Sequence, residues 1–126
     1  MPEERGTGES GHKVAGRLYA ALSVLHVVAA SGRRLPGAER FTGKDSPQGR
    51  IQGLRSDPYD DLLRAHGRPG DHGKAAAEAF RAIPGLLPPR SALHDTISAK
   101  ELDQFTAGYE TQLAEYRKSY GSLLPD

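Results

Sequence analysis

The stretch KVAGRLYAALSVLHVVAAS, residues 13 to 31, is the most apolar part of the chain and decides its fold. Apolar residues recur in it at three- and four-residue steps, the spacing of one helix face: Val14, Leu18, Leu22, Leu25 and Ala29. Tyr19, His26 and Val27 widen this apolar sector, which predicts a central helix that is buried on more than one side. Gly32 follows as a residue that can adopt the left-handed conformation that ends a helix.

The hydrophobicity of this stretch indicates neither a membrane-spanning helix nor a secretory signal peptide. Its continuous apolar run, LYAALSVLHVVAA over residues 18 to 30, is shorter than the ~20 apolar residues that a membrane-spanning helix needs. It follows the acidic residues Glu3, Glu4 and Glu9, whereas a secretory signal peptide begins with basic ones. We therefore predict a soluble, non-secreted, cytoplasmic protein with no membrane partner.

Two shorter helices are predicted in the middle of the chain. SDPYDDLLRAHG, residues 56 to 67, offers Asp57 as N-cap, Pro58 at the first helical position and Gly67 as the stop, with two acidic residues in the first turn. The next helix is predicted to begin with Asp71 as its cap and to end at Pro84 and Gly85.

The last helix has the clearest signals. It opens with the capping box formed by Ser98 and Glu101 and runs to Gly121. Large apolar residues line it at helical spacing: Leu102, Phe105, Tyr109, Leu113, Tyr116 and Tyr120. We expect the last three tyrosines to lie at the edge of the core with their hydroxyls in water, or alternatively to form a homodimer face.

These patterns predict an all-α fold, a small helical bundle of about four helices with a long irregular basic loop. No segment alternates with a period of two for long enough to predict a strand. Its 126 residues correspond to one domain, with a flexible tail over residues 1 to 12 and a single helical domain over residues 13 to 126. The apolar fraction of 37% predicts a thin core, which favours a homodimer.

The irregular loop spans residues 33 to 56 and carries an excess of positive charge. Its cationic residues are Arg33, Arg34, Arg40, Lys44, Arg50 and Arg55. One interpretation is disorder; the other is a loop anchored by Leu35, Phe41, Ile51 and Leu54 over the helix face that carries Tyr19 and His26. In the second case the arginines, with Phe41 and Tyr109, would bind a ligand that bears carboxylates or phosphates. The net charge of only +1 argues against nucleic acid as that ligand.

Two residues of the first helix are candidates for proton transfer. His26 and Tyr19 are seven residues apart, share a helix face and lie in an apolar setting. The alternative is that His26 is a core residue whose ring nitrogens are hydrogen-bonded. The chain has no cysteine, and its five histidines do not show the spacing of metal ligands, so we predict neither a metal site nor a cofactor.

The segments GHKVAGRLYAALSVLHVVAASGRRLPG and ELDQFTAGYETQLAEYRKSYG, together with the absence of cysteine, give the chain a resemblance to a known family. It resembles the small lanthipeptide-tailoring proteins of the cinnamycin and duramycin type, which form the lysinoalanine cross-link. The resemblance lies in size, helical layout and style along the chain, and it assigns no role to an individual residue. It implies a maturation enzyme for antibiotic biosynthesis that acts on a modified precursor peptide without a cofactor.

Such an enzyme adds the amine of a peptide lysine to dehydroalanine. The ammonium must lose a proton, which His26, Tyr19, an acidic residue or a group on the peptide itself could accept. The negative charge that develops on the dehydroalanine carbonyl needs a hydrogen-bond donor, either an arginine or a backbone amide. The alternative function is a non-catalytic helical dimer that binds an acidic or peptide ligand through the basic loop 33 to 56.

Overall fold

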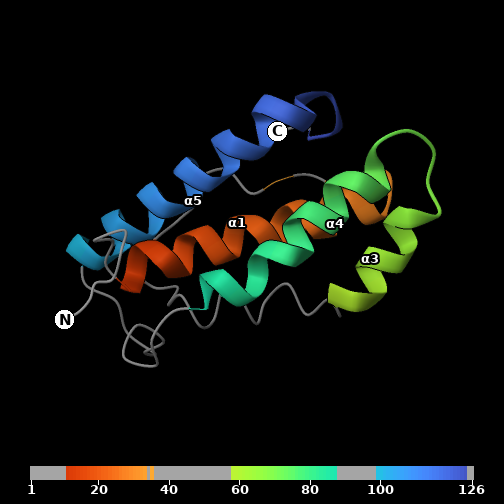
Figure 1. Ribbon diagram of the computed structural model, residues 1–126. Coiled ribbons are helices and arrows are strands. Elements are labelled where there is room, and N and C mark those ends of the chain that lie inside the picture. Colours follow the sequence, from red (N-terminus) through yellow and green to blue (C-terminus); the bar gives the residue numbers. More distant parts are fainter. Residues whose placement is uncertain (1–10, 34, 36–57, 88–98, 125–126) are drawn as a thin grey trace.

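A computed structural model describes residues 11–33, 35, 58–87 and 99–124 of the chain. Its α-helices are α1 (Gly11–Ala29), α3 (Pro58–His66), α4 (His72–Ala82) and α5 (Ala99–Tyr120), and the 3-10 turns Ile83–Leu86 and Gly121–Leu123 follow α4 and α5 (Figure 1). The described residues include no strand. The predicted all-α bundle of about four helices is therefore confirmed.

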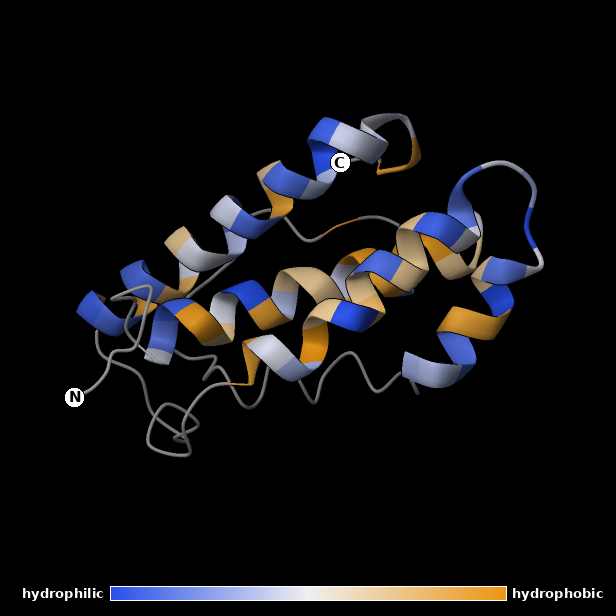
Figure 2. Ribbon diagram, viewed as in Figure 1, coloured by the Kyte–Doolittle hydropathy of each residue, from blue (hydrophilic) through white to orange (hydrophobic). Residues whose placement is uncertain are grey.

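The central helix of this bundle is α1. It packs most extensively against α5, and α4 and α3 cover further parts of its surface (Figure 1). Residues from Ala15 to Ala29 are buried on nearly every side of the helix. In Figure 2 the hydrophobic residues are concentrated on α1 and α4, whereas the outward side of α5 is mostly hydrophilic. The wide apolar sector of residues 13 to 31 thus finds its partners within one chain.

Two glycines allow α1 and α5 to approach very closely. A Cβ atom on Gly16 would overlap the carbonyl oxygen of Phe105, and one on Gly108 would overlap the carbonyl oxygen of Lys13. Each glycine therefore lies directly against the backbone of the other helix. Only glycine fits at such positions, because any side chain would push the two helices apart.

An aromatic cluster fills the space beside this crossing. The ring of Tyr19 lies 5.8 Å from that of Phe105 and 5.6 Å from that of Tyr109, measured between ring centroids. Phe105 and Tyr109 are essentially inaccessible to solvent. Such tilted aromatic pairs add to the stabilisation that burial alone provides.

The other tyrosines of α5 are also more buried than predicted. Tyr116 and Tyr120 are core residues, as Tyr109 is, so the expectation that their hydroxyls reach water is wrong for this structure. The hydroxyl of Tyr120 instead donates a hydrogen bond to Glu78 of α4, at 3.1 Å. The ring of Tyr120 is thus packed in the core, and its hydroxyl is bound by a neighbouring helix.

The helix ends agree only in part with the capping predictions. α1 begins at Gly11, two residues before the predicted start at Lys13. Gly32 adopts a φ of 84°, which confirms the left-handed stop. The predicted first position of α3 at Pro58 is also confirmed.

The turn between α3 and α4 differs from the prediction in two respects. The amide of Gly67 donates to the carbonyl of Leu63, as expected after a helix end, but the left-handed glycine of this turn is Gly70, with a φ of 72°. Asp71 occupies the N-cap position of α4, yet its side chain makes no capping hydrogen bond. Its backbone carbonyl accepts the first helical bond, from Ala75, at 2.9 Å.

Several predictions concern residues outside those described. These are the tail before Gly11, the caps Asp57 and Ser98, and the loop residues Arg34, Arg40, Phe41, Lys44, Arg50 and Arg55. Of the proposed loop anchors, Leu35 is described, and it is buried in the core. Among the described helices, none combines the length and the apolar character that a membrane crossing requires.

Candidate functional site

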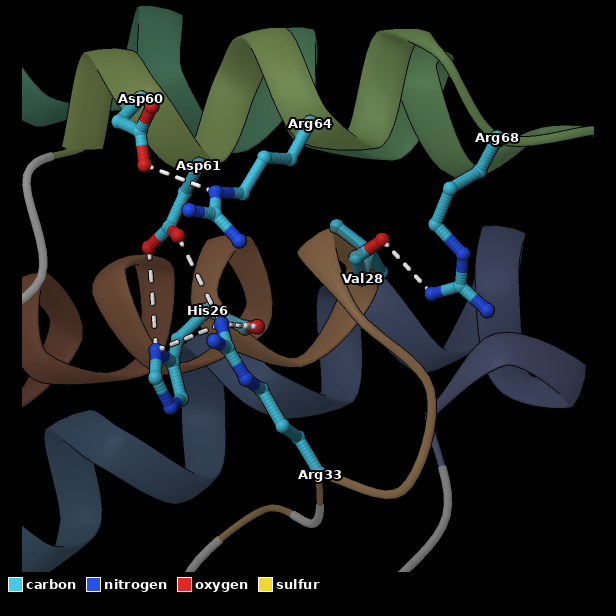
Figure 3. Close-up of polar contacts among 7 residues, drawn as sticks. All are labelled: His26, Val28, Arg33, Asp60, Asp61, Arg64 and Arg68. Carbon is cyan, nitrogen blue, oxygen red and sulfur yellow. Dashed lines mark hydrogen bonds and ion pairs between the residues drawn. The ribbon is translucent and has the colours of Figure 1, made fainter.

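Three charged or titratable side chains meet where the last turn of α1 faces α3 (Figure 3). Nη1 of Arg33 lies 3.2 Å from Nδ1 of His26 and 3.6 Å from Oδ1 of Asp61. Oδ2 of Asp61 lies 3.8 Å from the same Nδ1. We call His26, Arg33 and Asp61 the α1–α3 cluster.

The end of α1 brings Arg33 back onto the helix. After the left-handed turn at Gly32, Nη1 of Arg33 donates a hydrogen bond of 3.0 Å to the backbone carbonyl of His26. Arg68, which follows α3, donates in the same way to the carbonyl of Val28, also at 3.0 Å (Figure 3). Both arginines therefore satisfy carbonyls that the end of a helix leaves without a partner, and their positive charge suits the helix C-terminus.

The third member of the cluster comes from the first turn of α3, where two adjacent acids point in different directions. Asp60 is half exposed and pairs with Arg64 one turn later, at 2.8 Å. The side chain of Asp61 is only 6% exposed and turns toward α1. A buried carboxylate needs a compensating charge or hydrogen bonds, and Arg33 supplies that charge.

The surroundings of His26 keep its imidazole uncharged. Burial lowers the pKa of His26 below its ordinary value of 6.5, and the Arg33 guanidinium lowers it further, whereas the Asp61 carboxylate acts in the opposite direction. At neutral pH the ring is therefore neutral, with one nitrogen that accepts a proton and one that donates a hydrogen bond. Its side chain remains 28% exposed, so part of the ring is accessible from solvent.

This arrangement provides the elements of proton-transfer chemistry. A neutral imidazole can take up a proton, a carboxylate can stabilise the resulting imidazolium, and a guanidinium can stabilise a developing negative charge. All three groups come from two helix ends that are held together by buried contacts, so their geometry is preorganised.

The structure places the predicted site residues in two groups. It brings His26 and Arg33 together, but Tyr19 and Tyr109 pack against each other in the core at the α1–α5 interface. Tyr109 is 1% exposed, so the predicted ligand-binding role would require this core to open. The other predicted binding residues lie in the part of the loop outside the described residues.

Asp61 is the member of the cluster that the sequence did not identify. Two acidic residues in the first turn of a helix are explained by the helix dipole, so the pair Asp60-Asp61 does not by itself predict a site. Helical spacing distinguishes the two acids, because Asp61 lies on the same helix face as Ala65, which is also buried. An acid on the buried face of a short helix is a signal of a specific partner.

A second polar group lies on the opposite side of α1. Nε of Arg17 donates a hydrogen bond of 2.9 Å to Oε1 of Gln112, a nearly buried residue of α5. This contact ties together the two long helices beyond their glycine crossing. Since Arg17 and Gln112 satisfy each other, we assign them to the packing of the bundle.

In the described parts of the chain, no three histidine, aspartate or glutamate side chains group in a way that would hold a metal ion. Comparison of the chain with protein-family models, curated proteins and solved structures found no match. The α1–α3 cluster is therefore the feature of the structure from which a function can be inferred.

Proposed function

We propose that this protein forms a lysinoalanine cross-link in a lanthipeptide precursor, by adding the amine of a peptide lysine to a dehydroalanine. The observation that carries the proposal is the α1–α3 cluster, in which a neutral, partly exposed imidazole lies beside a guanidinium and a buried carboxylate. The resemblance to lysinoalanine-forming proteins supplies the substrate class. The partner would be the modified precursor peptide, in the cytoplasm.

The reaction is a proton transfer combined with one bond formation. His26 takes a proton from the lysine ammonium, and the amine nitrogen then attacks the β-carbon of dehydroalanine. The electron pair of the double bond moves toward the carbonyl, and the resulting enolate takes a proton at its α-carbon from the imidazolium. Atoms and electrons balance without a cofactor, and the product has the mass of the substrate.

Arg33 is the candidate for stabilising the enolate oxygen. The contacts described above use its Nη1 atom, and the guanidinium carries further N–H donors on Nη2 and Nε. Its side chain is 31% exposed. A guanidinium that is already fixed by the His26 carbonyl would lose little conformational freedom when it binds a substrate carbonyl.

The test is incubation of the protein with a dehydroalanine-containing precursor. Because closure leaves the mass unchanged, the remaining dehydroalanine is measured by the adduct that an added thiol forms with it. Wild-type protein should abolish the adduct. His26→Gln should lower the rate of closure about 10²- to 10⁴-fold, the usual contribution of a general base.

The matched control is His66→Gln, at an exposed histidine of α3, which should close the ring at the wild-type rate. The deficit of His26→Gln should shrink as the pH approaches ~10, where lysine loses its proton unaided. Circular dichroism establishes that both variants are folded. Equal rates for His26→Gln and wild type would exclude the proposed role of His26, and binding of the precursor without closure would favour the non-catalytic helical dimer instead.

A further inference from the structure

Among the described residues, Arg33 and Asp61 both lie beside the Nδ1 atom of His26, and they require different protonation states of it. Arg33 can only donate a hydrogen bond, so its 3.2 Å contact requires an unprotonated Nδ1 and places the ring proton on Nε2. Asp61 can only accept when ionised, so a hydrogen bond to it requires the proton on Nδ1. One ring nitrogen cannot satisfy both at once.

The observed distances correspond to the first of these states. The Arg33 contact is within hydrogen-bonding range, whereas the 3.8 Å between Nδ1 and Oδ2 of Asp61 is an ion-pair distance rather than a hydrogen bond. A shift of the ring or carboxylate by about 1 Å would reach the second state. Arg33 would keep its bond to the His26 carbonyl throughout, because that bond does not involve the ring.

We infer that Arg33 and Asp61 compete for Nδ1 of His26 and thereby determine which ring nitrogen carries the proton. Asp61 is then the positioning residue that turns Nε2 into a proton acceptor, and Arg33 favours the tautomer in which Nε2 donates. Among the described residues that Figure 3 draws beside the cluster, Asp60 pairs with Arg64, and Arg68 binds the carbonyl of Val28.

The consequence for catalysis rests on the proposed function. For Nε2 to take a proton from lysine, Nδ1 must carry the other ring proton and donate it to Asp61. The imidazolium formed in this step then has the Asp61 carboxylate beside it, and it returns the Nε2 proton to the α-carbon of the substrate. Without Asp61, the ring stays in the tautomer whose Nε2 can only donate.

The experiment is nitrogen-15 nuclear magnetic resonance of the histidine side chains, which distinguishes the tautomers directly in the protein without substrate. The His26 signals are assigned by their loss in His26→Gln. Asp61→Asn should shift the tautomer ratio toward Nε2–H, and Arg33→Met should shift it toward Nδ1–H. We expect each shift to be about tenfold, the factor that ~1.4 kcal/mol of lost interaction produces.

Asp60→Asn is the matched control, because it neutralises the adjacent acid, which pairs with Arg64 instead, and it should leave the ratio unchanged. If Asp61→Asn does not fold, the Arg33→Met spectrum decides alone. Unchanged ratios, or shifts of both variants in the same direction, would overturn the inference. A wild-type protein that shows the tautomer shifts but never closes the precursor would instead refute the proposed function and leave the competition for Nδ1 intact.

Discussion

Replacing Gly16 by alanine should strongly destabilise the protein, although the change adds only one methyl group. The added Cβ would overlap the carbonyl oxygen of Phe105 and would lie 2.8 Å from its carbonyl carbon and 2.9 Å from the amide nitrogen of Tyr109. These are backbone atoms of a long helix, so they cannot rotate away as a flexible side chain would. The two helices would have to separate along their most extensive contact.

Two opposing contributions determine the size of the effect. Alanine favours a helix interior over glycine by about 1 kcal/mol. Overpacking a well-filled interface costs about 1 to 3 kcal/mol and sometimes more, and contact with backbone places this site at the upper end. We therefore expect a net loss of at least ~2 kcal/mol in the free energy of unfolding, or about 6 to 12 °C in melting temperature for a chain of this size.

The assay is urea unfolding followed by circular dichroism. Gly108→Ala should behave like Gly16→Ala, because its Cβ would overlap the carbonyl oxygen of Lys13. The double variant should lose less unfolding free energy than the sum of the losses in the two single variants, since one separation of the helices relieves both overlaps. Gly121→Ala is the control, because no atom lies within 4 Å of its added Cβ. If Gly16→Ala unfolds at the same urea concentration as Gly121→Ala, the close crossing of α1 and α5 is wrong.

Three further predictions concern pH, the end of α1 and assembly. The unfolding free energy should fall as the pH drops below 6.5, because the lowered pKa of His26 means that the unfolded chain binds a proton more readily than the folded protein does. Urea titrations across this range should show that the unfolding free energy of His26→Gln depends less on pH than that of the wild type, and an equal pH dependence would contradict the prediction. Arg68→Met should cost about 1 kcal/mol by removing the hydrogen bond to Val28, whereas Arg64→Met, which breaks an exposed pair, should cost less than ~0.5 kcal/mol in the same denaturation assay. A homodimer should give twice the chain mass of 13.5 kDa by light scattering. Leu63→Asp, at a 55% exposed position of α3, should restore the single-chain mass. A wild-type mass of 13.5 kDa at micromolar concentration would exclude the homodimer.

Most of the fold could be predicted from the sequence because its signals are local. The helical spacing of apolar residues between Val14 and Ala29, the stop at Gly32 and the proline at the start of α3 each depend on a few neighbouring residues. The burial of the α5 tyrosines could not be predicted in the same way. Whether a tyrosine lies at the edge of a core or inside it depends on which helix packs against it. The hydroxyl of Tyr120 is bound by Glu78 of α4, which is 42 residues away in the sequence.

The glycine crossing had a sequence signal that remained unused. Gly16 and Gly108 each interrupt a strongly helical pattern, where glycine costs about 1 kcal/mol relative to alanine. An interior glycine in a helix therefore indicates a packing requirement. What the sequence could not reveal is that the two glycines serve a single crossing, since that depends on how α1 and α5 are placed in space.

The α1–α3 cluster was predictable only in part, for the same reason. His26 was a candidate because it shares an apolar helix face with Tyr19, and Arg33 because it is one of the cationic residues of the loop 33 to 56. Asp61 could be connected to them only by the packing of α3 on α1. Gly16 and His26 are ten residues apart on α1, about 15 Å along the helix axis, so the crossing with α5 and the cluster with α3 use separate parts of one rigid element. α1 can therefore be fixed by close backbone packing near its start while its last turn carries a partly exposed imidazole beside the Arg33–Asp61 ion pair, and neither requirement restricts the residues that serve the other.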